Sequence, residues 1–327
     1  MFVVTDSTAL ISPEASGLRG FLAKGGAWRF LVYMLVYLLV YLGVGRFTLL
    51  VARGVAEKPL LTSVSTVFIQ LTLGLIVGAV MLLATVRYMG WSEPLFGRQP
   101  IYRSWWMWVG PAIVAVPILL RLLGIEWGKN ALPVVVLVMA TGLLIGFVEE
   151  LLYRGIAVKM LRDGGHGEFV VAALTSLFFA VSHSVNLLSG QSIVTVGPTV
   201  AYTFAFGVLM YLTLRSVGFL AAAMILHGLT DPTTILATGG IDEIPSGASA
   251  NPLLAATGPL TILRIVAGPI LLLFVRGRVG DRTPVRRTRR EEAVTRTPVP
   301  AKRAMDVWDD DDDARRHHRA RRGHRGA

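Results

Sequence analysis

The sequence predicts an all-α integral membrane protein, a polytopic bundle of about eight transmembrane helices with both termini in the cytoplasm. Three observations lead to this fold class. Only 16% of the 327 residues are charged and 53% are hydrophobic, whereas soluble domains contain about 25% charged residues. The mean hydropathy is +0.59. Half of the Lys and Arg residues, 16 of 32, lie in residues 276–327, so the rest of the chain is strongly apolar.

Eight apolar stretches account for this body. A transmembrane helix needs about 20 mostly apolar residues, and Gly or Pro inside it is tolerated where neighbouring helices cover the backbone. No cleavable signal peptide is recognisable at the start of the chain, so we expect residues 1–27 to be a cytoplasmic segment and residues 28–276 a transmembrane domain. The predicted spans are 28–51, 63–87, 105–123, 132–161, 168–189, 193–215, 217–238 and 253–275.

The distribution of Lys and Arg predicts the orientation, because cytoplasmic loops carry the excess of these residues. With eight spans, both termini share a side. The opposite loops carry few basic residues, and residues 239–252 carry only the acids Asp242 and Glu243. The bias places both termini in the cytoplasm. The terminal side carries Arg19, Lys24, Arg29, Arg87, Arg98, Arg103, Lys159, Arg162 and Arg215; the opposite side carries Arg53, Lys58 and Lys129.

Residues 277–327 form a charged tail that we expect to be cytoplasmic and disordered, since it is too polar to build a core. The formal net charge of +11 would suit nucleic acid, but the excess follows an apolar body and is more simply a topology signal. We therefore expect the lipid bilayer as a partner and no specific nucleic acid. The absence of cysteine excludes disulfides, thiol nucleophiles and Cys-ligated metals.

Ionisable residues inside the spans are the candidates for function, because burying them in a membrane is costly. Two pairs, Glu150 with Arg154 and His227 with Asp231, are spaced i, i+4, so the members of each pair lie on one face of their helix. Glu149 lies about 100° around the helix from Glu150, so it can face the interior while Glu150 pairs with Arg154. Phe179 lies four residues before His183 and can pack against its ring. The six candidates are Glu149, Glu150 and Arg154 in the fourth span, His183 in the fifth, and His227 and Asp231 in the seventh.

The three segments are predicted to meet at one depth. With a rise of 1.5 Å per residue, Glu149 lies about 15–20 Å from the cytoplasmic end of its span. His183 lies about 22 Å from Glu168, and His227 lies about 16 Å from Ser216. A carboxylate and a histidine at one point can activate water, while a second histidine and Asp231 can stabilise an oxyanion or hold a metal. This combination predicts hydrolysis.

Other intramembrane protease chemistries do not fit the spans. They contain no His-Glu-x-x-His metalloprotease helix and no Gly-x-Ser-x-Gly nucleophile. Asp231 is the only Asp in a span core, which excludes an aspartyl dyad.

The three motifs resemble those of the CPBP family, which comprises CAAX proteases and bacteriocin-processing enzymes and includes CAAX prenyl endopeptidases of the Abi type. Glu149, Glu150 and Arg154 match its Glu-Glu-x-x-x-Arg motif, and Phe179 with His183 matches Phe-x-x-x-His. His227 and Asp231 match His-x-x-x-Asn/Asp. The motifs occur in the family's order, and the resemblance covers about residues 130–235.

This resemblance implies an intramembrane endopeptidase whose site opens toward the cytoplasm and whose substrate is a membrane-associated or lipid-modified protein or peptide. It implies Glu149 as the base for water, His183 as its partner, and His227 with Asp231 as oxyanion stabilisers. A metal-dependent version, with Zn²⁺ as the candidate, would draw ligands from Glu149, His183, His227 and Asp231. The metal-free version uses Glu149 as base and the His227 ring as donor.

Two other functions remain open. In a proton-coupled carrier, the buried Glu and His residues would relay protons, although no halved internal repeat is visible. In a non-catalytic membrane scaffold or immunity protein, the same residues would be a relic site.

Overall fold

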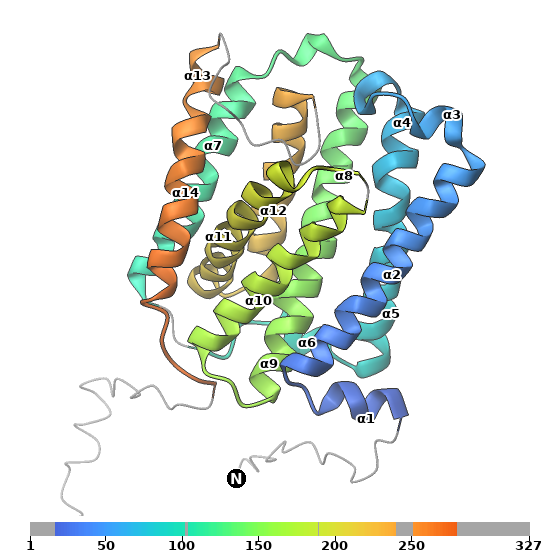
Figure 1. The fold of residues 1–327 in the computed structure, drawn as a ribbon. Coiled ribbons are helices and arrows are strands. Elements are labelled where there is room, and N and C mark those ends of the chain that lie inside the picture. Colours follow the sequence, from blue (N-terminus) through green and yellow to red (C-terminus); the bar gives the residue numbers. More distant parts are fainter. Residues whose placement is uncertain (1–16, 102–103, 189, 240–250, 280–327) are drawn as a thin grey trace, which may run out of the picture. The chain divides into compact units, whose positions relative to one another are not determined.

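The computed structural model describes residues 17–101, 104–188, 190–239 and 251–279, and within these ranges every regular element is helical. Short 3₁₀ and π segments (η) alternate with the α-helices (Figure 1). The elements are α1 Gly17–Ala23, α2 Ala27–Val51, α3 Arg53–Ala56, η1 Leu60–Thr62, α4 Val64–Val67, η2 Phe68–Thr72, α5 Leu73–Met89, α6 Ser92–Phe96, η3 Trp105–Trp108, α7 Val109–Gly124, η4 Trp127–Lys129, α8 Leu132–Glu150, η5 Leu151–Ala157, α9 Val158–Asp163, α10 Glu168–Ser182, η6 His183–Leu187, α11 Ile193–Val217, α12 Leu220–Thr238, α13 Pro252–Ala255 and α14 Thr257–Leu272.

Eight helical stretches in the described ranges are long and apolar enough to cross a membrane, which confirms the predicted polytopic bundle. Their bounds lie within a few residues of the predicted ones. The stretches are Ala27–Thr48, Val64–Met89, Trp105–Gly124, Leu132–Asp163, Glu168–Leu187, Ile193–Val217, Leu220–Thr238 and Pro252–Leu272. The predicted cytoplasmic segment and charged tail fall mostly on residues 1–16 and 280–327, outside the described ranges.

One predicted boundary is wrong. The seventh span does not begin at residue 217, because α11 continues to Val217 and ends at Gly218, whose φ of 88° is left-handed. Helix α12 begins at Leu220. His227 therefore lies about 10 Å along its helix, not the 16 Å expected from Ser216.

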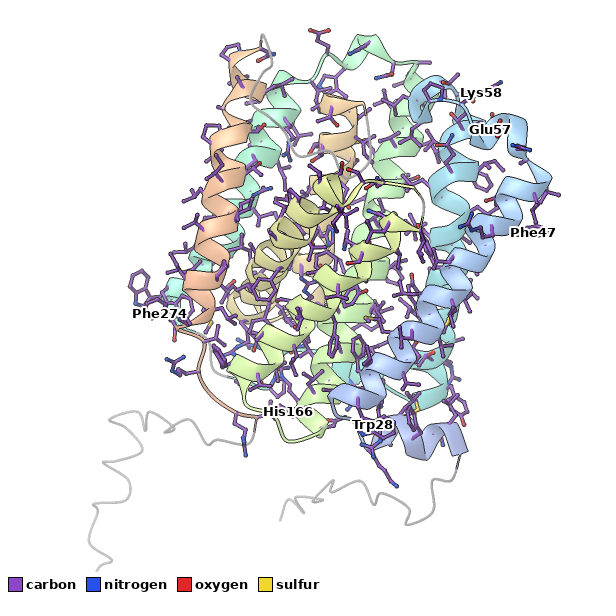
Figure 2. The ribbon with its side chains drawn as sticks, viewed as in Figure 1. Trp28, Phe47, Glu57, Lys58, His166 and Phe274 are labelled. Carbon is purple, nitrogen blue, oxygen red and sulfur yellow. The ribbon has the colours of Figure 1, made fainter. Side chains whose placement is uncertain are left out.

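The first and last described residues lie at one end of the bundle, which we call the terminal end. The Gly26 amide donates to the Met160 carbonyl, and the Glu168 amide donates to the Gly277 carbonyl over 2.9 Å. We call the opposite end, which carries α3 and α13, the distal end (Figure 1). In Figure 2, Trp28 and His166 lie at the terminal end, and Glu57 and Lys58 lie at the distal end.

The outer surface of the helices is apolar. Trp28, Phe47 and Phe274 project outward from the bundle (Figure 2), and each is more than half exposed. Exposed aliphatic side chains accompany them on α2, α5 and α14. Such a surface suits lipid contact, in agreement with an integral multi-pass membrane protein.

Glycines bring α8 and α12 unusually close together. A Cβ atom on Gly146 would lie 2.3 Å from the Met224 carbonyl oxygen and 2.4 Å from the Gly228 nitrogen. One turn earlier, a Cβ atom on Gly142 would lie 2.3 Å from the Pro232 ring. Small residues four apart are how membrane helices approach backbone to backbone. This crossing lies next to Glu149 on α8 and next to His227 on α12.

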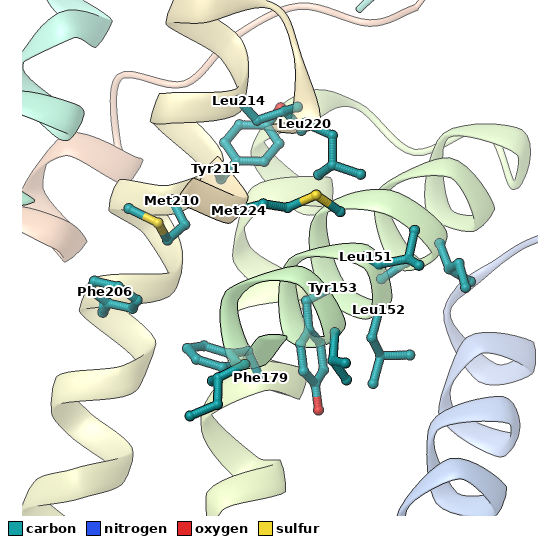
Figure 3. Close-up of a cluster of buried hydrophobic side chains, with 14 of the residues drawn as sticks. Leu151, Leu152, Tyr153, Phe179, Phe206, Met210, Tyr211, Leu214, Leu220 and Met224 are labelled. Atoms are coloured by element: carbon teal, nitrogen blue, oxygen red, sulfur yellow. The ribbon is translucent and has the colours of Figure 1, made fainter. Parts of the chain in front are cut away.

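An apolar cluster fills the bundle between this crossing and the terminal end. Figure 3 shows its side chains, contributed by η5, α10, α11 and α12. Tyr153 packs edge-on against Phe179 with ring centroids 5.1 Å apart. Leu214, at the end of α11, and Leu220, at the start of α12, are fully buried. The cluster therefore separates the middle of the bundle from the terminal end.

A buried ionic group joins α9, α10 and α11 near the terminal end. Glu168 is fully buried and accepts two hydrogen bonds from Arg162, each 2.8 Å long. It also accepts from Arg215 over 3.0 Å and from the Tyr211 hydroxyl. Two of the arginines counted toward the charge bias are thus bound inside the protein.

Candidate active site

The central feature of the bundle is a cavity of about 610 Å³. Its walls are largely apolar and aromatic, and their side chains come from α2, η2, α5, α7, α8, η5, α10, η6, α11 and α12. Four of the sequence-predicted site residues share this wall. They are Glu149, His183, His227 and Asp231.

Glu150 and Arg154 lie behind that wall. Both side chains are fully buried, and Arg154 Nη1 lies 3.1 Å from Glu150 Oε1. The neighbouring Glu149 side chain is 27% exposed and lines the cavity. The predicted division of the two glutamates, one inward-facing and one paired with Arg154, is confirmed. Neither Glu150 nor Arg154 touches the cavity, so each can act on chemistry there only by positioning another residue.

His227 connects the two glutamates. Its Nδ1 lies 2.7 Å from Glu150 Oε1. Its Nε2 lies 3.5 Å from Glu149 Oε2 and 3.4 Å from Asp231 Oδ2. Because the buried carboxylate fixes Nδ1, the ring holds Nε2 toward the cavity, between two further carboxylates.

Two aromatic rings pack against the imidazole ring of His227. Phe206 lies edge-on at a centroid distance of 4.9 Å, and Phe179 lies edge-on at 5.8 Å. Phe179 also faces the Arg154 guanidinium, whose carbon is 4.6 Å from the ring centroid. Phe179 therefore packs the ion pair on one side and the imidazole on another.

His183 is oriented by its own helix. Its Nδ1 lies 2.9 Å from the Phe179 carbonyl oxygen, four residues earlier. A carbonyl only accepts, so Nδ1 carries the hydrogen and Nε2 is left as an acceptor. The predicted contact with the Phe179 ring is present, at a centroid distance of 4.8 Å.

A π-helical segment, η5 at Leu151–Ala157, begins immediately after Glu150. Single π-helical turns often mark functional sites, because they change which residues face a neighbouring helix. Arg154 lies inside η5 and still reaches Glu150. The sequence pattern, which reads as one continuous helix, gives no sign of this widening.

The donors do not form a metal centre in this geometry. Across the described ranges, no three His, Asp or Glu side chains converge as a group that could hold a metal ion. His227 Nδ1 is bound to Glu150. Among the described residues, the four side chains considered for Zn²⁺ do not form such a group, and the mechanism proposed below uses no metal.

Arg121 is a cavity residue that the sequence analysis did not single out. An arginine near the end of the predicted span 105–123 is expected to be structural or to extend to the membrane surface. Instead, its side chain is 1% exposed and lines the same cavity as Glu149. Its signal in the sequence was an arginine inside an apolar span, the criterion that selected the other candidates.

The exposed part of the cavity wall lies on α2 and at the end of η6, in the half of the bundle nearer the distal end. Its exposed lining residues are Gly45, Arg46 and Leu188. Arg46 Nη2 donates to the Leu188 carbonyl over 3.2 Å across this rim. Toward the terminal end the apolar cluster packs against the cavity, and a second, smaller cavity of about 100 Å³ on that side reaches Arg154.

Comparison with known proteins supports the resemblance seen in the motifs. Residues 130–233 match the sequence model of a family described as type II CAAX prenyl endopeptidase Rce1-like. The match covers about a third of the chain, from α8 through most of α12, and includes all six sequence-predicted site residues. A search of curated proteins finds no match.

Proposed function

We propose that this protein is an intramembrane endopeptidase that hydrolyses a peptide bond with a water molecule activated by Glu149. The observation that carries the proposal is the convergence of Glu149 and Asp231 on His227 Nε2, within 3.5 Å, in an internal cavity. The segment that builds this convergence is the one that matches a protease family.

Glu149 is the base in this proposal. Its carboxylate takes a proton from water, and the water oxygen forms a bond to the carbonyl carbon of the substrate. His183 Nε2, left as an acceptor by the bond at Nδ1, holds the second hydrogen of the same water. The carbonyl oxygen then carries the negative charge of the tetrahedral intermediate.

His227 is the oxyanion donor. With both ring nitrogens protonated, Nδ1–H donates to Glu150 and Nε2–H donates to the oxyanion. Asp231 accepts from the same edge of the ring before the substrate arrives. When the intermediate collapses, the carbon–nitrogen bond breaks, and Glu149 returns its proton to the leaving amine. Glu150 and Arg154 are positioning residues that hold the imidazole.

The position of the exposed cavity wall also bears on how the protein is oriented in the membrane. If the charge bias places the termini in the cytoplasm, the mouth at Arg46 and Leu188 faces the extracytoplasmic side. We propose this orientation, in which a segment of a membrane-associated or lipid-modified protein enters from the distal end. The description of the matching family names a prenyl endopeptidase, but the proposed peptidase function does not require the substrate of this chain to be prenylated.

The absence of cysteine makes the orientation simple to test. Lys58→Cys lies at the distal end and His166→Cys at the terminal end (Figure 2). In intact cells, a membrane-impermeant maleimide should label Lys58→Cys and leave His166→Cys unlabelled until the cells are lysed. The reverse pattern would place the mouth in the cytoplasm.

The proteolytic activity is tested by comparing new protein termini in membrane fractions of cells expressing the wild type or Glu149→Gln. Terminal-peptide mass spectrometry should find termini that vanish with Glu149→Gln at matched expression. Identical termini would contradict the proposal and favour the carrier or the scaffold.

A further inference from the structure

We propose that Arg121 is a substrate-binding residue that recognises a carboxylate group of the peptide inside the cavity. This inference rests on the proposed peptidase function only for the identity of the ligand as a peptide. The anion site itself is a property of the cavity wall and can be measured without catalysis.

The first observation is that two of the three Arg121 nitrogens are buried and have no hydrogen-bond partner among the described residues. The Arg121 side chain is 1% exposed, and the two atoms are Nε and Nη1. Leaving a buried charged group unsatisfied is costly, and buried arginines are usually paired. An unsatisfied guanidinium on the wall of a cavity indicates that its partner comes from outside the protein.

Two other intramembrane arginines have partners inside the protein. Arg154 makes no hydrogen bond within the described residues, but its guanidinium lies 3.1 Å from the Glu150 carboxylate. Arg264 on α14 is equally buried but donates to the Val114 carbonyl and the Tyr202 hydroxyl, both over 2.9 Å. It also reaches the Ile113 carbonyl, whose helical partner would be the N–H that Pro117 lacks. Arg264 on α14 therefore has a structural role, because it donates to backbone carbonyls of α7. Arg121 lies on α7 itself, and its buried Nε and Nη1 atoms make no such bond among the described residues.

The second observation is the place of Arg121 relative to the reacting groups. Asp231 is close enough to interact with Arg121 electrostatically, and Asp231 is also 3.4 Å from His227 Nε2. Arg121, Asp231 and His227 also line the same cavity. A ligand carboxylate on Arg121 would hold the peptide backbone beside Glu149.

Asp231 alone does not account for the guanidinium. Its nearest nitrogen contact is to His227, and its side chain is 31% exposed, facing the cavity. Arginine offers five N–H donors in a planar fork that suits carboxylates. A second carboxylate would satisfy donors that Asp231 leaves open, in a cavity of about 610 Å³ large enough for several peptide residues.

The carboxylate can come from two places on a peptide: its free C-terminus or an Asp or Glu side chain. The chemistry at Arg121 is the same for both. The test therefore uses three apolar dansyl pentapeptides: dansyl-Ala-Leu-Val-Leu-Phe as the free acid, the same peptide as the C-terminal amide, and the amide with Glu replacing the second Leu.

Binding is measured by fluorescence on full-length Glu149→Gln protein in lipid nanodiscs, where no turnover occurs. We expect the free acid, the Glu-containing amide, or both to bind at least about tenfold more tightly than the plain amide. Arg121→Met should abolish that preference and leave the affinity for the plain amide unchanged, while Arg121→Lys should keep part of it. Arg46→Ala, which removes a rim cation, is the matched control and should keep the preference.

Each outcome decides the proposal. A preference for the free acid alone identifies the C-terminal carboxylate as the ligand, and a preference for the Glu peptide alone identifies a side chain. Equal affinity for all three peptides overturns the proposal, as does a preference that survives in Arg121→Met. If Arg121→Met does not fold, a preference unchanged in Arg121→Lys counts against it. If the comparison of protein termini finds no cleavage that depends on Glu149, the proposed peptidase function is contradicted, but these binding results still decide whether Arg121 binds a carboxylate.

Discussion

The closest approach of α8 and α12 gives the sharpest test of how the site is positioned. In Gly146→Ala, the new methyl group would lie 2.3 Å from the Met224 carbonyl oxygen and 2.4 Å from the Gly228 nitrogen. Both atoms belong to the backbone and cannot rotate away. Since ordinary contacts begin at 3.4 Å, the helices must separate by about 1 Å.

That separation acts directly on the catalytic contact. His227 precedes Gly228, so the 2.7 Å bond from its Nδ1 to Glu150 would lengthen to about 3.7 Å, beyond hydrogen-bond range. A displacement of 1 Å in a reacting group costs about 100-fold in rate. We expect that loss in cleavage of a substrate identified from the wild type. Overpacking destabilises by about 1–3 kcal/mol, against about 1 kcal/mol gained from helix propensity, so the melting temperature should fall only modestly.

Gly43→Ala, in α2, is the matched control. It is the same substitution inside a transmembrane helix, and its Cβ would meet nothing within 4 Å. Its rate and melting temperature in detergent should equal or exceed those of the wild type. A Gly146→Ala protein with wild-type rate and stability would refute the claim that this crossing sets the geometry of His227.

Three further substitutions separate stability from chemistry. Arg154→Ala should lower both activity and the free energy of unfolding, by about 3–5 kcal/mol, because Glu150 is left buried without its cation; normal thermal stability with lost activity would contradict the structural part of this role. Asp231→Asn should reduce kcat by about tenfold or more at a nearly unchanged melting temperature. The reason is that its carboxylate is partly exposed and lies 3.4 Å from the reacting edge of His227. An unchanged kcat would show that Asp231 does not act in the site. Glu168→Gln should destabilise the protein by leaving two buried arginines without a carboxylate while folded molecules keep wild-type kcat, and a melting curve identical to that of the wild type would contradict this.

Local information in the sequence was sufficient to predict the transmembrane helices and the convergence of the three motifs on one site. Hydropathy over about 20 residues is a property of each helix alone, and i, i+4 spacing fixes which side chains share a face. The pairing of Glu150 with Arg154, and the inward position of Glu149, follow from that spacing. The error in the start of α12 arose because Gly218, which ends α11, lies in a short apolar connection without a charge to mark it.

The direction of the cavity and the role of Arg121 depend on tertiary structure. Which side of α7 faces inward is set by its packing against α12 and α14, not by its own composition. The glycines at 142, 146 and 228 are visible in the sequence, but their partners are known only once α8 and α12 are placed together. Which part of the cavity wall is exposed depends on how α2 and η6 lie relative to the other helices, which no single helix encodes.

The central claim is that Glu149 activates water for attack on a peptide bond. It is tested most directly with purified protein and a peptide nominated by the comparison of termini, in ¹⁸O-labelled water under single-turnover conditions. We predict one ¹⁸O atom in the new C-terminal carboxylate for the wild type, and no product for Glu149→Gln despite unchanged peptide binding. Product formed by Glu149→Gln at the wild-type rate would contradict the account.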